Sequence, residues 1–308
     1  MALEIGEQDA AWMVSLAGLP GIVSLQPMEG GWDNTNSLLC LDDGSKVVLK
    51  AWNSNSVDEV SRVVERHLHL QSNGIPTAVP LELNDKRLFR ERAGVAWTLL
   101  PYFEGGHLGT DRDSLRSLGE TQARMHLIPI SECFPETYKM GFDFFEEVIE
   151  LAGVKGDRSE FIETLTREGE SLKSRVTGTL PIGVLHGDLF PDNVIGSGSV
   201  DAILDLEEGW IGPLAFDLAM SFVGFGWQGG SPVESRWEAL VEGYQSVRRL
   251  SEEEIGKLPD LHRYATLAIA CWRYWKHNLS EPDANLAKRY VEMVDRLDVD
   301  FYFGGAFE

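Results

Sequence analysis

The alternation of apolar and polar positions changes character about a third of the way along the chain. In the first hundred residues a short amphipathic helix at 8–17 precedes β-rich runs at 23–28, 37–41, 46–52, 87–91 and 95–102. The turn Asp42-Asp43-Gly44-Ser45 joins the second run to the third, and Asn55 or Ser56 can cap a longer helix over 57–71. This order predicts an antiparallel meander with one main helix.

From residue 111 onward the apolar spacing is helical. It predicts helices at 114–126, 142–151, 159–175, 215–222, 232–247, 251–278 and 285–297, with a β interlude at 183–185, 193–195 and 202–204. Glu104-Gly105-Gly106 breaks the pattern between the two parts. We therefore predict an α+β protein with a β-rich domain at residues 1–103 and a mainly helical domain at 104–308.

The net charge of the chain disfavours some classes of binding partner. The 308 residues carry a formal charge of −22, so nucleic acids and anionic membranes are disfavoured as partners. The first residues lack a basic start followed by an apolar stretch, and the longest apolar runs fall well short of the roughly 20 residues that span a bilayer. We expect a cytoplasmic protein that binds neither nucleic acid nor membrane.

The segment His186-Gly187-Asp188-Leu189-Phe190-Pro191-Asp192-Asn193, followed by Asp205 at the end of a predicted strand, carries the strongest chemical signal. Asn193 and Asp205 offer hard oxygen ligands that suit magnesium, and Asp188 can orient an attacking hydroxyl and accept its proton. These residue types at this spacing indicate magnesium-assisted phosphoryl transfer. The alternative is that Asp188 and Asn193 form turns and that Asp205 ends a strand.

Lys50 closes the predicted strand 46–52, where alternation places it on the same face as Val48. An ammonium group beside apolar neighbours requires an anion, and a nucleotide phosphate can supply one. An acidic residue on the following helix can hold the ammonium in place. We favour Glu65, with Glu59 as the alternative.

The segment 29–36 is rich in glycine and short polar side chains, including Gly30, Gly31, Asn34 and Thr35. Such a turn can bring backbone N–H groups close to phosphate oxygens. A simple Gly-Gly hairpin is the alternative, but the position ahead of Lys50 favours a phosphate-binding loop.

In this order, Lys50, Glu65, the loop 186–193 and Asp205 resemble the aminoglycoside phosphotransferase and choline kinase superfamily over nearly the whole chain. The resemblance implies a protein-kinase-like fold with a small antiparallel-sheet N-lobe that binds nucleotide and a larger helical C-lobe that holds the catalytic loop and the acceptor site. The chain looks most like the bacterial kinase-like homoserine kinases, through residues 29–36, 74–76, 186–194 and 215–219. The stretches 247–251 and 272–275 are also similar to theirs.

The resemblance also implies residue roles. Asp188 would be the catalytic base, Asn193 and Asp205 would hold magnesium, and Lys50, paired with Glu65, would contact the α- and β-phosphates of ATP. Further roles would fall to the linker near Pro101 to Phe103, which would bind adenine through its backbone, to His186, which would brace the catalytic loop, and to Asp217, which would fix it from below. Helix capping alone is the alternative for Asp217.

The chain departs from the homoserine kinases near the predicted acceptor pocket. Those enzymes usually have Ala where Gly187 stands, and they differ from this chain over 206–213. Within that segment Glu207 and Glu208 could accept an ammonium group, or they could form a solvated acidic rim. Arg263 and Arg273 are candidate carboxylate binders, with surface arginines on a packed helix as the alternative.

Together these features predict an ATP- and magnesium-dependent kinase that phosphorylates a hydroxyl of a small, polar, amine-bearing metabolite. Homoserine is the leading candidate. The alternatives are an aminoglycoside, choline or ethanolamine, methylthioribose, an amino sugar or a hydroxylated amino acid. A catalytically inactive, nucleotide-binding pseudokinase is an alternative of another class, and we expect a monomer or a homodimer.

Overall fold

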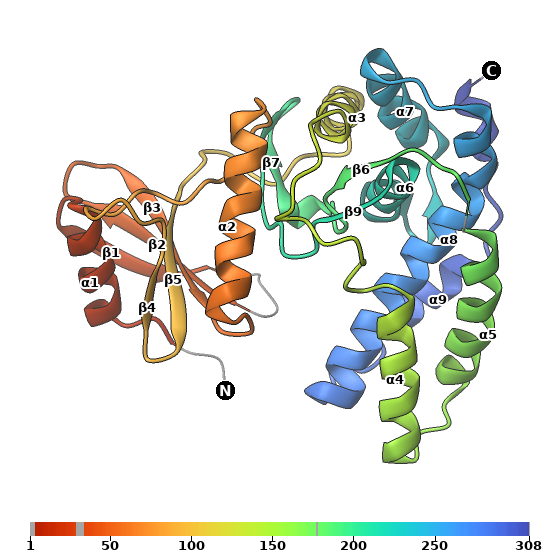
Figure 1. Cartoon of the computed structure of the whole chain (residues 1–308), viewed down its shortest axis with the longest axis horizontal. Helices are drawn as coiled ribbons and strands as arrows, with labels where there is room; N and C mark the ends of the chain where they lie inside the picture. Colours follow the sequence, from red (N-terminus) through yellow and green to blue (C-terminus); the bar gives the residue numbers. More distant parts are fainter. Residues whose placement is uncertain (1–3, 29–33, 177, 308) are drawn as a thin grey trace. The chain divides into compact units, whose positions relative to one another are not determined.

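The computed structural model describes residues 4–28, 34–176 and 178–307, and the chain folds into two compact units. Unit 1 comprises Met1–Gly106 together with Asp201–Glu207, and unit 2 comprises His107–Val200 and Glu208–Glu308. The sequence predicts one boundary, after residue 103. It does not predict that residues 201–207 belong to unit 1. Figure 1 labels the elements of both units.

Unit 1 is built on an antiparallel sheet with the strand order β1-β2-β3-β5-β4. Its elements are α1 (Glu7–Ala17), β1 (Ile22–Pro27), β2 (Thr35–Leu41), β3 (Lys46–Trp52), α2 (Val57–Ser72), β4 (Arg90–Arg92) and β5 (Val95–Pro101). Helices α1 and α2 lie on opposite sides of this sheet (Figure 1). The predicted meander and main helix are therefore confirmed.

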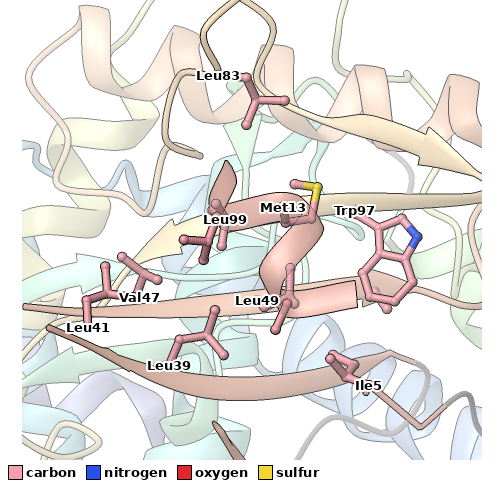
Figure 2. Packing of buried hydrophobic residues seen from close by; sticks show 12 residues of the cluster. Ile5, Met13, Leu39, Leu41, Val47, Leu49, Leu83, Trp97 and Leu99 are labelled. Carbon is pink, nitrogen blue, oxygen red and sulfur yellow. The ribbon is translucent and has the colours of Figure 1, made fainter. Parts of the chain in front are cut away.

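Side-chain alternation on β3 separates a core face from a polar face. Val47, Leu49 and Ala51 pack with Met13 of α1 and with Leu99 of β5 in one buried cluster, shown in Figure 2. Lys50 points away from that cluster because successive strand residues face opposite sides. The strand thus places the Lys50 ammonium on the sheet face that α1 does not cover.

Helix α2 begins where its capping residues dictate. The Ser56 hydroxyl accepts a hydrogen bond from the backbone N–H of Glu59, while the Glu59 carboxylate accepts one from the N–H of Ser56. Glu59, the alternative partner for Lys50, is used in this cap. The helix then buries Val60, Val63, Val64 and Leu70, as its apolar stripe predicts.

Unit 2 is mainly helical, as predicted. Its longer elements are α3 (Arg112–His126), α4 (Phe142–Lys155), α5 (Glu160–Arg175), β6 (Ile182–Leu185), β9 (Trp210–Pro213), α6 (Leu214–Phe225), α7 (Glu234–Val247), α8 (Glu252–Tyr274) and α9 (Val291–Leu297). The shorter ones are η1 (Pro191–Asn193), β7 (Val194–Gly196), β10 (Trp227–Gln228), β11 (Ser231–Pro232), η2 (Trp275–Ser280) and η3 (Phe303–Phe307). Strand β8 (Val200–Ile203) leads into the 201–207 segment of unit 1.

Helix pairs organise unit 2 around β6. Helix α3 packs along α7, and α6 packs on α8, which also contacts α5 and α9 (Figure 1). Strand β6 pairs with β9 in an antiparallel register that sets Leu185 opposite Trp210. The loop that follows β6 therefore starts from a buried strand end surrounded by α3 and α6.

Several elements differ from the sequence prediction. The short elements β9, β10, β11 and η3 have no counterpart in it, and for β9 a four-residue strand containing Gly212 and Pro213 gives a weak β signal. The α-helix predicted to reach residue 278 ends at Tyr274 and continues as the π-helix η2. The helix predicted from 285 starts only at Val291, because residues 284–290 form turns such as that closed by Leu286 N–H to Asp283 C=O.

Candidate active site

In unit 1, Lys50 is buried between carboxylates and an aromatic ring. Its ammonium nitrogen lies 3.0 Å from Oε1 of Glu207 and 3.4 Å from Oδ2 of Asp205, and its side chain is only 8% exposed. The same nitrogen stands 3.7 Å from the centre of the Trp52 ring. A buried ammonium requires such counter-ions, because burial without them costs much solvation free energy.

The close charges shift the pKa values of both Lys50 and Glu207. Burial acts to lower the pKa of Lys50, but the charges of Asp205 and Glu207 outweigh it and hold that pKa above its ordinary value. Burial and the nearby charge of Asp205 raise the pKa of Glu207 to about 7, against the opposing charge of Lys50. The single positive charge of Lys50 thus does not fully neutralise the carboxylates of Asp205 and Glu207.

The predicted pair between Lys50 and Glu65 is wrong for this structure. Glu65 is half exposed on α2 and lies 3.6 Å from Arg62, one turn away on the same helix. The helix instead turns Arg66 inward, and Nη1 of Arg66 donates hydrogen bonds to the carbonyls of Leu206 (2.8 Å) and Glu207 (3.2 Å). The carboxylate beside Lys50 therefore comes from residues 201–207, which α2 holds by their backbone.

Further contacts hold the 201–207 segment against the rest of unit 1. Ile203 donates its N–H to the carbonyl of Pro76 at 2.9 Å, and its own carbonyl accepts from the hydroxyl of Thr77 at 3.0 Å. Asp205 then adopts a left-handed conformation with φ 51°, which is uncommon for a residue with a side chain. Such a conformation persists only where its surroundings enforce it, and it is frequent at functional sites.

The predicted phosphate loop is described in part. Gly30 and Gly31 lie outside the described residues. The Asn34 side chain donates from Nδ2 to Oε1 of Glu207 at 2.7 Å and accepts from the backbone N–H of Asn53 at 3.0 Å. Thr35 opens β2 and accepts from Nδ2 of Asn53 at 2.8 Å. Glu207 Oε1 thus joins the end of this loop to Lys50.

Pro101 ends β5 directly opposite Val47 of β3, and Phe103 follows two residues later. Both residues are half-buried in unit 1. They stand where the sheet gives way to the segment that leaves it, and their role in adenine binding stays a prediction.

In unit 2, the loop after β6 holds Asp188 and Asn193 against each other. Nδ2 of Asn193 donates to the carbonyl of Asp188 at 2.7 Å and to its carboxylate at 3.2 Å. The backbone N–H of Asp188 donates to Nδ1 of the buried His186 ring at 3.2 Å. That His186 braces the loop stays a prediction.

Asp217 fixes the start of this loop. Its two carboxylate oxygens accept from the backbone N–H groups of His186 (2.9 Å) and Gly187 (2.8 Å). Burial acts to raise the pKa of Asp217, but the hydrogen bonds that its carboxylate accepts, from the His126 side chain and from the His186 backbone among others, act against burial, and the net effect is a lowered pKa. Asp217 lies inside α6, so capping does not account for it.

The residues of each unit fit a magnesium ion in their chemistry. Because the amide nitrogen of Asn193 is directed to Asp188, its Oδ1 is the atom left to face a cation. Asp205 adds a carboxylate that is 37% exposed. Within 4–28, 34–176 and 178–307 no group of three or more His, Cys, Asp or Glu could hold a metal. Magnesium binding by Asn193 and Asp205 stays a prediction.

The remaining predicted residues have partners within unit 2. Glu208 lies 3.3 Å from Lys139. Arg263 pairs with Glu168 at 2.7 Å, and Arg273 pairs with Glu292 at 3.0 Å. These ion pairs give the two arginines a structural use, and their binding of an acceptor carboxylate stays a prediction.

Unit 2 contains a cavity of about 270 Å³, which is linked to the loop 186–193 through Tyr138. Tyr138 and Trp210 line it, and the Tyr138 hydroxyl donates to the carbonyl of Gly187 at 2.7 Å. The other aromatic lining residues are Phe142, Phe216 and Tyr264. Aromatic walls of this kind suit an apolar group or a cationic amine.

Sequence reasoning missed Arg66, Tyr138 and the pairing of Glu207 with Lys50. Arg66 stands three positions after Val63, on the apolar stripe of α2. A charged residue at such a position could have indicated its inward direction. Tyr138 lies in an irregular segment whose spacing carries no such signal.

Comparison with known proteins identifies the family of the chain. Residues 24–250 match the model of the phosphotransferase enzyme family. A homoserine kinase of Rhizobium etli is 25% identical, covering 99% of this chain and 97% of its own. Another, of Neisseria meningitidis, is 27% identical, with 89% of each chain covered.

A solved structure extends the likeness to the fold. Amicoumacin kinase, in complex with AMP-PNP, Ca²⁺ and its ligand, superposes with a TM-score of 0.72 at 14% identity over 95% of this chain and 93% of that one. The predicted kinase-like fold is therefore confirmed. Among the residues that the structure describes, no helix has the length and apolar character needed to cross a bilayer. Since the family model covers most of the chain, the protein belongs to the phosphotransferase enzyme family.

Proposed function

We propose that this phosphotransferase uses ATP and magnesium to phosphorylate the hydroxyl of a small amine-bearing metabolite, with homoserine as the leading candidate. The observation that carries the proposal is the buried Lys50 ammonium, held by Asp205 and Glu207 on the face of the sheet opposite α1. A triphosphate can take over from these carboxylates as the counter-ion, because it brings several negative charges to the same point.

Each residue then has a chemical task. Lys50 binds the α- and β-phosphates, and Asp188 orients the acceptor hydroxyl and takes its proton. The hydroxyl oxygen attacks the γ-phosphorus while the bond from that phosphorus to the β,γ-bridging oxygen breaks. The products are a phosphate monoester, ADP and one proton, which Asp188 passes to solvent. When bound through Asn193 and Asp205, magnesium supplies neutralisation of the phosphate charge.

The similarity to homoserine kinases over nearly the full chain supports homoserine as the acceptor. Glu208 and the aromatic cavity favour an amine more generally, since both attract a cation. Gly187 and the segment 206–213 depart from those enzymes, so amino alcohols and amino sugars belong in the same test. Complete retention of Asp188, Asn193 and Asp205 disfavours the pseudokinase.

A coupled assay of ADP release tests the proposal. Homoserine, serine, ethanolamine, choline, an aminoglycoside and methylthioribose are compared with magnesium present and with it chelated. We expect homoserine to give the highest kcat/KM, and turnover to require magnesium. Asp188→Asn should abolish transfer while leaving binding of ATP nearly intact. ADP release by Asp188→Asn at the wild-type rate contradicts the role of Asp188, and stimulation by another acceptor alone contradicts homoserine.

A further inference from the structure

A chain of polar side chains, all buried except the half-buried Arg248, runs through unit 2 from the junction of α7 and α8 to the catalytic loop. Oε1 of Glu254 accepts from Nη2 of Arg248 at 2.8 Å, and Nη1 of Arg248 reaches the Tyr244 hydroxyl at 3.2 Å. That hydroxyl lies 2.8 Å from Nδ1 of His126, whose Nε2 lies 3.2 Å from Oδ2 of Asp217. Asp217 binds the loop backbone directly, as described above.

Hydrogen-bond chemistry gives this chain one direction. Arginine can only donate, so the Tyr244 oxygen accepts from Arg248, and its own O–H is available to donate to Nδ1 of His126. When Nδ1 accepts this bond, the neutral His126 ring carries its proton on Nε2 and donates it to Asp217. In this arrangement every donor in the chain has one acceptor.

The fold enforces these contacts. Helices α3 and α7 approach closely because Gly119 and Gly243 stand at their contact, where a Cβ on Gly119 would lie 2.7 Å from the backbone nitrogen of Tyr244. The rings of His126 and Tyr244 meet there edge to face, with their centres 5.5 Å apart. Both residues are buried.

The outer end of the chain is equally ordered. Ser251 caps α8, and Glu254 accepts from the Ser251 N–H through Oε2 at 2.9 Å while it binds Arg248 through Oε1. Glu254 is 1% exposed. The segment 247–251, similar to homoserine kinases in sequence, has no place in the binding of ATP or acceptor, and this arrangement gives Arg248 and Ser251 a use.

We propose that Tyr244 and Arg248 are positioning residues for phosphoryl transfer, which act through His126 and Asp217 to hold the loop that carries Asp188 and Asn193. The proposal rests on the catalytic role of Asp188 proposed above. The loop needs such support because Gly187 has φ 82° and the two N–H groups beside it have Asp217 as their acceptor. A small displacement there moves Asp188 relative to the attacking hydroxyl.

Tyr244→Phe is the first test, because it removes one oxygen and leaves the ring. We expect kcat to fall by about tenfold or more, and KM for ATP to stay within about twofold, since the chain holds the base and does not contact nucleotide. Tyr274→Phe is the matched control: its buried hydroxyl bonds to Ser159 at 2.7 Å, away from the chain. That control should keep the wild-type kcat.

His126 variants separate positioning from packing. His126→Gln can still present an N–H to Asp217 and should retain much more of the wild-type kcat than His126→Leu. Adding Tyr244→Phe to His126→Leu should lower kcat no further, because the chain is already broken. Additive losses, or equal losses in the Gln and Leu variants, contradict action through one chain.

Hydrogen exchange of the His186 and Gly187 amides gives a readout that needs no turnover. Both amides should exchange faster in Tyr244→Phe than in Tyr274→Phe, even if the acceptor is not among the compounds tried. Unchanged exchange together with unchanged kcat overturns the proposal. Wild-type protein that turns over no acceptor overturns the proposed function instead, and the exchange experiment still decides on the chain.

Discussion

At the scale of single residues, Lys50 is held inside the protein by a balance of charges. Asp205 and Glu207 both lie within 3.4 Å of its ammonium, so removing that ammonium leaves two carboxylates together. Losing one partner of a buried ion pair costs about 3–5 kcal/mol, and the partial exposure of Asp205 reduces the figure here.

Lys50→Met should therefore destabilise unit 1 by about 1–3 kcal/mol and abolish phosphoryl transfer. Adding Glu207→Gln should restore most of the stability, since one of the repelling charges is gone, but none of the activity. Urea unfolding and ADP release measure the two effects. A double variant as unstable as Lys50→Met would show that the carboxylates do not repel each other in this site.

Gly187 is required by its backbone and by its neighbours. It has φ 82°, and a Cβ there would press on the carbonyl oxygen of Glu208 and lie 3.2 Å from Cδ1 of Trp210. Gly198 has a similar φ of 71° but open space around its Cα. The two positions separate backbone strain from steric conflict.

Gly187→Ala should cost about 2–4 kcal/mol in unfolding free energy, against about 1 kcal/mol for Gly198→Ala, which has the strain alone. It should also lower kcat, because relief of the contact displaces the catalytic loop. Equal costs for the two variants would mean that segment 208–210 yields easily. The usual Ala of homoserine kinases would then fit this chain as well.

At the scale of elements, α3 and α7 cross where each helix offers a glycine to the backbone of the other. A Cβ on Gly243 would lie 2.9 Å from Cα of Arg116 and closer still to its carbonyl oxygen. No side-chain movement relieves a contact with backbone, so the helices themselves must separate. The His126–Tyr244 contact lies at the same crossing.

Gly243→Ala should therefore destabilise the protein by about 2 kcal/mol or more, despite the higher helix propensity of alanine. The exposed Gly256 of α8, with no neighbour near its Cα, is the matched control, and Gly256→Ala should stabilise by up to about 1 kcal/mol. Urea unfolding compares the two. Stabilisation by both substitutions would mean that the crossing tolerates a methyl group.

Short sequence patterns are enough to predict some of the elements and some of the site residues. Capping residues Ser56 and Ser251 mark the starts of α2 and α8, and the loop 186–193 carries its own chemistry. Glu65 illustrates the limit: its spacing from Lys50 suits a pair, but helix rotation exposes Glu65 and buries Arg66. The partner of Lys50 comes from more than 150 residues away, where only tertiary structure can bring it.

At the scale of the whole molecule, 49 acidic residues against 27 basic ones give a net charge of −22. Like charges crowd together more in the folded chain than in the unfolded one, so self-repulsion opposes folding. Salt screens this repulsion, but it also weakens surface ion pairs such as Lys86–Glu82. Screening of the self-repulsion stabilises the folded chain, whereas weakening of the ion pairs destabilises it. The larger of the two effects decides how salt changes the stability.

Exposed ion pairs contribute about 0–1 kcal/mol each, and many contribute nothing measurable. The net charge acts over the whole surface, within a Debye length that shrinks from about 30 Å at 0.01 M salt to about 8 Å at 0.15 M. We therefore expect the urea midpoint to rise over this range, equally in NaCl and KCl. Urea is the required denaturant because guanidinium is itself a screening salt. A midpoint that falls as salt is added would mean that specific ion pairs, and not net charge, dominate the electrostatics of folding.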